Sequence, residues 1–330
     1  MFEQRLDLYR KLEEKQNSRL LVYVTGDRLG LETSIGNDVY DFFVNHLDKI
    51  SPVPKISLYL YTRGGDTLAA WGIINLIKQF ADELEVIIPS KCHSAGTLMT
   101  LGAKQIVMTK QATLGPIDPS VNHPLNPQIP GGPPNARVPI SVEAIEGYIQ
   151  LVKEECEFNA EHDSNKLIEI LSNYVHPLVL GQVYRAKAQI KMLSKRLLVG
   201  HIQDDEKIDK IINFLCSASG SHDYTIHRRE ARDELGLNII TPSEDLYNII
   251  KDIYDDIRNE LQLTSAYNPN QILGAEQNKP YSIKRALLES IIGGGNYFVS
   301  DGILTQQMMQ IQPGMMQQVI NDQRTFEGWR

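Results

Sequence analysis

Short apolar runs that alternate with helical segments constrain the fold of this chain more than any other feature. Four such runs lie between residues 19 and 115, separated by segments of helical periodicity: LLVYV, ISLYLYT, LEVIIP and QIVMT. Strands that are apolar along their whole length are typical of a parallel sheet covered by helices on both faces. The first 115 residues are therefore predicted to form an array of βα units.

The residues before this array are rich in charge. Residues 1–18 place Phe2, Leu6, Tyr9 and Leu12 three or four positions apart, so these apolar side chains share one side of a helix. This narrow apolar stripe predicts a helix that docks on the rest of the molecule or on another subunit.

A proline-rich stretch follows the array. Half of the 16 prolines lie between Pro116 and Pro139, a stretch with neither helical nor strand periodicity. Long loops beside an α/β sheet are commonly lids or binding loops. The chain is then predominantly helical, with Ser141 placed to cap the first helix. We therefore divide the chain into three parts: an amino-terminal helix at 1–18, a core domain at 19–240 and a helical carboxyl-terminal extension at 241–330.

The composition excludes several classes of function. The 330 residues include 33 basic and 41 acidic side chains, and this net charge of −8 argues against a chain whose main task is to bind nucleic acid or an anionic membrane surface. The three cysteines are too scattered for a disulfide framework or a paired metal-ligand motif. The amino terminus lacks the apolar core of a secretory signal, and no uninterrupted apolar run is long enough to span a membrane. We expect a cytoplasmic protein without an integral membrane segment.

A pair of glycines follows the second apolar run. The sequence YTRGGDT leads from the strand at 56–61 through Gly64 and Gly65 directly into a helix. Two glycines allow a sharp turn with outward-facing N–H groups, which is the geometry that an oxyanion hole needs. The same pair is also compatible with an ordinary tight turn.

A serine lies at the equivalent place after the third run. Ser94 begins a helix, and the small residues Ala95 and Gly96 leave room for a substrate carbonyl beside it. An ordinary N-cap serine would have the same local sequence. Because both turns follow parallel strands, they open at the same edge of the sheet, where the sites of open α/β sheets form.

The residues just before Ser94 are less suited to the chemistry. His93 is adjacent to Ser94, and adjacent side chains diverge at a sharp turn, so His93 is expected to border the site. Cys92 ends the strand run without small neighbours, and buried free cysteines are usually inert.

These turns and the segments after them resemble the ClpP/crotonase superfamily, in particular the serine dehydrogenase proteinases, which are related to the signal-peptide peptidase A-type serine peptidases. Four segments within residues 20–240 carry the resemblance: LYLYTRGGDTLAA, SAGTLMTLGAKQIVM, ATLGPIDPS and SHDYTIHRREARDELGL. The resemblance implies a ClpP/crotonase-like α/β fold, a spiral of βα units with a parallel sheet and helical accessory segments. It also implies a homo-oligomeric serine peptidase that acts on a peptide or protein substrate and uses neither cofactor nor metal.

Carried onto this sequence, the resemblance makes Ser94 the nucleophile that forms an acyl-enzyme. Gly65 and Ala95, with the neighbouring Gly64, would form the oxyanion hole, where each backbone donor contributes about 3–4 kcal/mol to the transition state. A segment that contains Leu114, Gly115 and Asp118 would lie on the substrate side of the site and bring a substrate or partner segment past the nucleophile.

The sequence leaves open which group takes the proton from Ser94. The place of the histidine in ClpP proteolytic subunits corresponds to about Pro119, so His123 could serve only if the proline-rich loop folds back. Signal-peptide peptidase A-type enzymes instead use a lysine on a later helix, kept neutral by burial. Three lysines here lie on later helices: Lys153, Lys187 and Lys191.

Two further observations bear on this choice. The lysine that the serine dehydrogenase proteinases often carry in the last of these helices aligns with Arg185, and arginine cannot act as a base. Lys187 and Lys191 share one face of that helix. In the SHDY segment, His222 is an alternative base that Asp118 could orient. Lys187, Lys191 and His222 are thus competing candidates.

Two other functions are compatible with the same turns. A crotonase-like enzyme could use Gly65 and Ala95 to hold the enolate of an acyl thioester, although no basic cluster indicates a site for the nucleotide of coenzyme A. A catalytically silent scaffold with the ClpP fold could bind a protein partner through its carboxyl-terminal helices. No G-x-G-x-x-G follows the first strand, so a nicotinamide cofactor is not expected.

Overall fold

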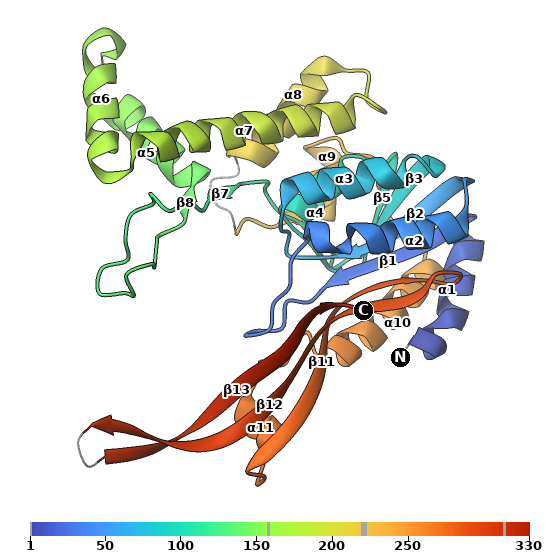
Figure 1. The fold of residues 1–330 in the computed structure, drawn as a ribbon. Helices are drawn as coiled ribbons and strands as arrows, with labels where there is room; N and C mark the ends of the chain where they lie inside the picture. Colours follow the sequence, from blue (N-terminus) through green and yellow to red (C-terminus); the bar gives the residue numbers. More distant parts are fainter. Residues whose placement is uncertain (1, 157–158, 219–222, 313–314) are drawn as a thin grey trace. The chain divides into compact units, whose positions relative to one another are not determined.

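The computed structural model of the chain describes four stretches of residues: 2–156, 159–218, 223–312 and 315–330. The chain forms two compact units. The first comprises residues 1–113 and 237–330, and the second comprises residues 114–236. A large sheet dominates the first unit, whereas the second is mostly helical (Figure 1).

An eight-stranded mixed sheet forms the centre of the first unit, with its strands in the order β10-β5-β3-β2-β1-β11-β12-β13. The strand bounds are β1 (Arg19–Thr25), β2 (Val53–Tyr61), β3 (Ala81–Ile88), β5 (Gln105–Met108), β10 (Ile239–Ile240), β11 (Asn278–Ser290), β12 (Gly294–Gln312) and β13 (Met315–Trp329). Neighbours from β10 to β1 are parallel, and β11, β12 and β13 continue the sheet in antiparallel pairs. The predicted parallel βα array is confirmed.

Helices cover both faces of the parallel strands, with α2 and α3 above the sheet and α1 and α10 below it in Figure 1. The first unit contains α1 (Phe2–Gln16), the 3-10 turn η1 (Asn37–Val39), α2 (Tyr40–Ile50), α3 (Thr67–Ile77), α4 (Ala95–Thr100), α10 (Glu244–Leu261) and α11 (Pro269–Leu273), and the short strand β4 (Lys91–Cys92). Tyr23 of β1 meets Phe43 of α2 edge to face, with ring centroids 5.2 Å apart. Val22 and Val24 lie in the buried cluster on the opposite face. Burial on both faces explains the unbroken apolar runs.

The amino-terminal helix docks within its own unit. Tyr9 and Leu12 of α1 are fully buried in one cluster with Ile253 and Ile257 of α10. The prediction of a docking helix is thus confirmed, and its partners are α10 and the sheet.

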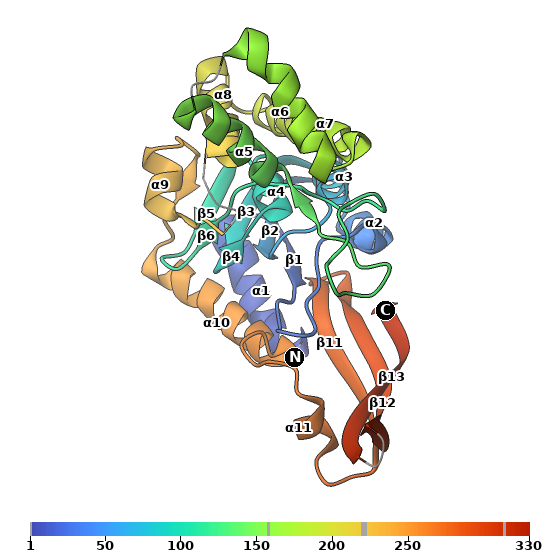
Figure 2. The same ribbon diagram turned by 90° about the vertical axis from the view of Figure 1, so that its left-hand side faces the viewer.

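The predicted helical extension at residues 241–330 is wrong beyond residue 277. Residues 278–290, 294–312 and 315–329 form β11, β12 and β13, which lie side by side in Figure 2, and β11 pairs directly with β1. At the start of β11 exposed and less exposed residues alternate, as expected of a strand. Gln and Met favour helices in isolation, but pairing with an existing sheet satisfies the backbone of this segment and overrides that preference.

The second unit consists of helices on a small core that includes Val142, Val179 and Val183. Its elements are β7 (Ser120–Val121), β8 (Ile140–Ser141), α5 (Val142–Glu155), α6 (Ala160–Tyr174), α7 (Pro177–Leu198), α8 (Asp205–Asn213), the π-helix η2 (Phe214–Ala218), β9 (Ile226–His227) and α9 (Arg228–Asp233), and β6 (Thr113–Leu114) spans the boundary between the units. Ser141 caps α5 as predicted, because its Oγ accepts a hydrogen bond from the N–H of Ala144 at 3.1 Å. No helix in the described part of the chain is both long and apolar enough to cross a bilayer.

Candidate active site

Two strand-to-helix turns of the first unit lie against each other at the carboxyl edge of the parallel strands. One follows β2 and contains Thr62, and the other follows β3 and contains Lys91 and His93. The N–H of Thr62 donates to the carbonyl of Lys91 at 3.0 Å, and the carbonyl of Thr62 accepts from the N–H of His93 at 3.1 Å. The predicted meeting of the two turns at one sheet edge is confirmed.

Ser94 has a strained backbone at the end of the second turn. Its φ of 52° and ψ of −117° lie in a region that residues other than glycine rarely adopt, at a cost of about 1–3 kcal/mol. A sharp turn of this kind between a strand and a helix exposes the serine hydroxyl. The hydroxyl does not cap α4, and it makes no hydrogen bond to any described residue. The ordinary N-cap interpretation of Ser94 is therefore wrong.

Gly64 packs directly against Ser94. A methyl group on Gly64 would lie 2.7 Å from Cβ of Ser94 and 3.3 Å from the backbone nitrogen of Ala95, so no larger residue fits. The N–H of Gly64 donates to Oγ1 of Thr62 at 3.0 Å. Of the three residues predicted to form the oxyanion hole, Gly64 thus brings the turns together, and its own N–H is already bonded.

The N–H groups of Gly65 and Ala95 have no acceptor among the described residues. Ala95 is the first residue of α4, where a backbone N–H has no partner inside the helix. Gly65 is exposed, with a φ of 147°. Two unpaired backbone donors therefore lie on the touching turns beside Ser94, and such donors can stabilise a developing negative charge.

The packing beneath Ser94 requires small residues. A methyl group on Gly96 would lie 2.4 Å from Cγ2 of Thr62 and 3.0 Å from Sγ of Cys92. Cys92 is fully buried, and burial raises the pKa of its thiol, which suits the predicted lack of reactivity. The ring of His93 contacts Thr113 through Nε2, 2.9 Å from Oγ1.

Charged side chains also fix the strand ends at this edge. Asp27, which is nearly buried, forms an ion pair with Lys91 and accepts a hydrogen bond from the hydroxyl of Tyr61 at 2.9 Å. Burial, assisted by Asp27, raises the pKa of Tyr61, so the phenol stays protonated. These contacts join Asp27, shortly after β1, to the last residue of β2 and to the turn that follows β3.

Lys187 and Lys191 lie on α7 of the second unit. Lys187 forms an ion pair with Glu146 of α5, and Nζ of Lys191 donates to Oδ1 of Asn213 at 3.3 Å. Both lysines act on one buried thiol: burial raises the pKa of Cys216 to about 12, and the two positive charges oppose that rise. The two ammonium groups therefore share one environment, as their spacing on one helix face predicted.

The remaining candidate bases are dispersed. Lys153 is exposed on α5. Nδ1 of His123 accepts a hydrogen bond from the N–H of Leu125 at 3.1 Å within the proline-rich loop. His222 lies outside the described residues.

The segment predicted to lie on the substrate side has mixed properties. The side chain of Leu114 is fully buried. Asp118 accepts hydrogen bonds from Oγ of Ser141 at 3.0 Å and from the N–H of Glu143 at 3.3 Å, so it supports the start of α5. Gly115 lies between them in the chain. Among the described residues, no three His, Cys, Asp or Glu side chains are arranged to hold a metal ion.

Two residues that position the glycine turn were not identified from the sequence. Thr62 joins the turns, as described above, and the backbone of Ile35 pairs with that of Gly65 in a parallel bridge. The N–H of Ile35 donates to the carbonyl of Gly64, and its carbonyl accepts from the N–H of Asp66, both at 2.8 Å. Thr62 could have been suspected from its place at the strand end, whereas nothing in the local sequence of Ile35 indicates this pairing.

The fold and the strained serine turn define a ClpP-like α/β protein with a serine at the carboxyl edge of its parallel strands. Residues 1–130 match the family described as ClpP-like SDH-type serine proteinase. The uncharacterized protein MJ0137 of Methanocaldococcus jannaschii is 30% identical over 257 residues, which cover 75% of this chain and 77% of that protein. MJ1495 of the same organism, also uncharacterized, is 26% identical over 259 residues, 76% of this chain and 74% of its own length. This chain belongs to the ClpP-like SDH-type serine proteinase family.

Solved structures of proteases show weaker similarity. ClpP1 from Listeria monocytogenes has 17% sequence identity and a TM-score of 0.37, covering 72% of this chain and 99% of that chain. A mutant of the 1510-N membrane-bound stomatin-specific protease has 15% identity and a TM-score of 0.39, covering 74% of this chain and 86% of that chain.

Proposed function

We propose that this protein is a serine peptidase that hydrolyses peptide bonds through an acyl-enzyme on Ser94. The observation that carries the proposal is the contact between the strained Ser94 turn and the glycine turn, where the N–H groups of Gly65 and Ala95 find no acceptor in the described part of the chain. Membership of a serine proteinase family supports peptidase activity in general.

The geometry suits acyl transfer. Oγ of Ser94 attacks the scissile carbonyl while a general base takes its proton, and the carbonyl oxygen becomes an oxyanion that accepts hydrogen bonds from the N–H groups of Gly65 and Ala95. Collapse of this intermediate expels the amine, which receives the proton from the base. Water, activated by the same base, then hydrolyses the acyl-enzyme. Because both donors belong to fixed turns, they need no reorganisation during the reaction.

The base in this scheme would be one of three candidates, Lys187, Lys191 or His222. Lys187 is engaged by the carboxylate of Glu146, whereas the partner of Lys191 is a neutral amide. A neutral Lys191 would therefore leave no carboxylate without its cation. We favour Lys191 among the lysines for this reason.

The nucleophile is tested by Ser94→Ala, with hydrolysis of a fluorogenic peptide library and labelling by a fluorophosphonate as readouts. We expect kcat to fall by at least about a thousandfold, as for other serine nucleophiles, and labelling to disappear. Ser51 provides a matched control, because it is exposed and also has a left-handed backbone, with φ of 65°. Ser51→Ala should retain both signals. Equal hydrolysis by the Ser94→Ala and wild-type proteins would refute the proposal, and a wild-type protein that is never labelled would favour the silent scaffold.

The base is tested by comparing Lys187→Met, Lys191→Met and His222→Gln. We expect Lys191→Met to lower kcat/KM by about a hundredfold or more, in the range of general-base effects, with the other two variants changed much less. The pH dependence of kcat/KM in the wild type distinguishes the chemistry, since a histidine base gives a rise near neutral pH. If only His222→Gln is inactive, the assignment to a lysine is wrong.

A further inference from the structure

A buried arginine on a carboxyl-terminal strand lies at the start of a chain of contacts that leads to the glycine turn. Arg285 belongs to β11 of the first unit and is only 9% exposed. Lys284 pairs with Val299 and Ala286 pairs with Phe298, so Arg285 is the extra residue of a β-bulge. A bulge redirects a side chain away from the regular ladder of a sheet.

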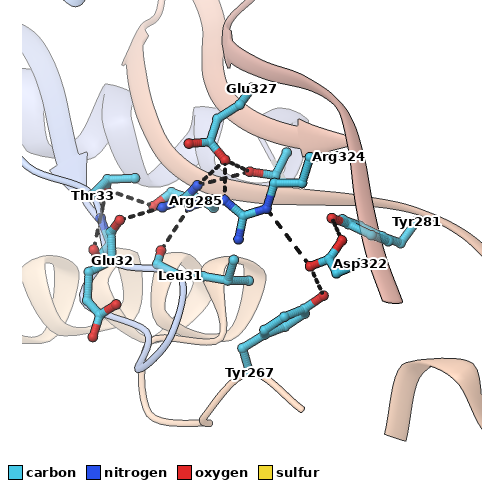
Figure 3. Close-up of polar contacts among 11 residues, drawn as sticks. Leu31, Glu32, Thr33, Tyr267, Tyr281, Arg285, Asp322, Arg324 and Glu327 are labelled. Carbon is cyan, nitrogen blue, oxygen red and sulfur yellow. Dashed lines mark hydrogen bonds and ion pairs between the residues drawn. The ribbon is translucent and has the colours of Figure 1, made fainter. Parts of the chain in front are cut away.

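The guanidinium of Arg285 joins two segments, as Figure 3 shows. On one side, Nε donates to the carbonyl of Leu31 at 3.0 Å and Nη2 donates to the carbonyl of Glu32 at 2.5 Å. On the other side, Nη1 donates to Oγ of Ser300 at 3.0 Å and to Oε2 of Glu327 at 2.7 Å. Four acceptors around one planar group match the fixed donor geometry of arginine, which lysine cannot reproduce.

The main chain of Arg285 contacts the same segment. Its carbonyl accepts a hydrogen bond from the N–H of Gly26 at 2.9 Å, and a methyl group on Gly26 would lie 2.2 Å from that oxygen. Residues 26–33 form a closed loop, because the N–H of Thr33 donates to the carbonyl of Gly26 at 2.7 Å. Residues 26–36, called here the latch segment, are thus held against β11 at their start and in the middle.

The latch segment ends on the glycine turn. Through Ile35 it holds the carbonyl of Gly64 and the N–H of Asp66, the peptide groups on either side of Gly65. The Gly64 carbonyl and the Gly65 N–H belong to one planar trans peptide, so they point in opposite directions. A rotation that withdrew the N–H of Gly65 from the site would therefore break the bond between Ile35 and Gly64.

We infer that Arg285 is a positioning residue for the oxyanion hole: it holds the latch segment in the conformation in which Ile35 fixes the direction of the Gly65 N–H. This inference rests on the peptidase function proposed above and adds a positioning role of the carboxyl-terminal strands at the same site. Without Arg285, the carbonyls of Leu31 and Glu32 lose their donors, and the segment that carries Ile35 is free to shift.

The test compares Arg285→Gln with Arg324→Gln. Arg324 also donates to Oε2 of Glu327, at 2.6 Å, and lies 3.9 Å from Asp322, but it makes no hydrogen bond to the latch segment among the described residues (Figure 3). Each variant thus loses one positive charge and the arginine hydrogen bond to Glu327. Complete loss of an oxyanion donor lowers kcat about 10²–10³-fold, so we expect a misplaced donor in Arg285→Gln to lower kcat about 10–100-fold, with KM changed by less than about threefold. Arg324→Gln should stay within about twofold of the wild-type kcat.

A milder variant and a second measurement guard against misfolding. Arg285→Lys keeps the charge beside Glu327 but supplies one nitrogen for four acceptors. We therefore expect this variant to fold and still to show most of the decrease in kcat that is expected for Arg285→Gln. Amide hydrogen exchange in residues 26–36 and 64–66 should be faster in both Arg285 variants and unchanged in Arg324→Gln.

Exchange separates this inference from the proposed function. If the wild type shows no hydrolysis that depends on Ser94, the peptidase proposal fails, and exchange alone decides whether Arg285 fixes the glycine turn. Faster exchange confined to the Arg285 variants supports the inference. The inference is overturned if amide exchange in the Arg285 variants equals that in Arg324→Gln. It is also overturned if the wild type is active and folded Arg285→Lys has the same kcat as Arg324→Gln.

Discussion

The parallel and antiparallel halves of the large sheet are stabilised by different kinds of buried side chain. In the parallel half, β1 and β2 are buried by apolar side chains on both faces, and the turns that carry Ser94 and Gly64 follow from where such strands end. In the antiparallel half, β11 places Arg285 and Glu289 in the interior, 9% and 0% exposed. Apolar burial thus sets where the parallel strands end, whereas in the antiparallel half directional contacts of buried charges hold the neighbouring segments in place.

Glu289 shows how strongly these buried charges are connected. Its Oε1 accepts hydrogen bonds from Nη2 of Arg5 at 2.5 Å and from the hydroxyl of Tyr297 at 2.9 Å. Arg5, on α1, also contacts Asp256 and Glu260 of α10 at 2.5 and 2.6 Å. Burial alone would raise the pKa of Glu260, but hydrogen bonds from Lys284 and Arg5 bring it below its usual value. The network ties α1, α10 and β11 together.

The largest expected effect comes from removing one member of this network. Arg5→Met leaves Glu289 buried without its cation, so we expect a loss of about 3–5 kcal/mol in the free energy of unfolding, measured by urea denaturation. Arg10 on the same helix is exposed, and its one ion pair with a described residue is to the exposed Asp7, at 2.6 Å, so Arg10→Met should cost less than about 1 kcal/mol. Similar losses in both variants would show that the antiparallel half does not depend on its buried charges.

The next effect concerns the parallel half and falls on catalysis. In Gly65→Ala the new methyl group would lie 2.3 Å from the carbonyl oxygen of Ile35, so the peptide must move. We expect kcat for peptide hydrolysis to fall about 10²–10³-fold, as when an oxyanion donor is lost. Gly131→Ala is the matched control, because Gly131 also has a positive φ, of 73°, but has open space around it. If both variants keep wild-type kcat, Gly65 is not part of the site.

A smaller effect, on the pH dependence of stability, is expected from a buried histidine that joins α2 to the antiparallel half. His46 of α2 is 1% exposed and contacts the connection between β11 and β12. Oγ of Ser290 accepts from the N–H of Gly293 at 2.8 Å and lies 2.7 Å from Nδ1 of His46, and Oδ1 of Asn296 accepts from Nε2 of His46 at 3.0 Å. A neutral imidazole protonated on Nε2 satisfies both contacts of the ring, with Nδ1 accepting from the Ser290 hydroxyl. Burial lowers the pKa of His46, and the hydrogen bond to Asn296 opposes this in part.

The protein should therefore lose stability in acid through His46. The unfolded chain binds a proton at this position below about pH 6.5 and the folded chain only at lower pH, so the free energy of unfolding decreases by up to about 1.4 kcal/mol per unit as the pH falls through that interval. His46→Gln should reduce this decrease in urea titrations between about pH 7 and 5. His227→Gln, at an exposed position, should leave it unchanged. An identical pH dependence in His46→Gln and wild type would contradict the assignment.

Much of the parallel half could be predicted because its signals are local. The runs that form β1, β2, β3 and β5 are apolar on both faces, because a strand that is buried on both faces needs apolar residues at consecutive positions. The carboxyl-terminal strands were predicted as helices because their Gln and Met residues carry a helical preference and β11 has buried charges in place of a clean alternation. Partners in the sheet, which no short window contains, decided their conformation.

The candidate site divides in the same way. The sequence by itself determined Gly64, Gly65, Ser94 and Ala95, because glycines and a serine at strand-to-helix junctions are read from neighbouring residues. Only the tertiary structure decided the long-range contacts that hold these turns: Ile35 on Gly64, Arg285 on Leu31 and Glu32, and Arg5 on Glu289, a pair separated by 284 positions. Hydrogen bonds between distant residues form only after apolar burial has brought their elements together, so periodicity and spacing carry no record of them.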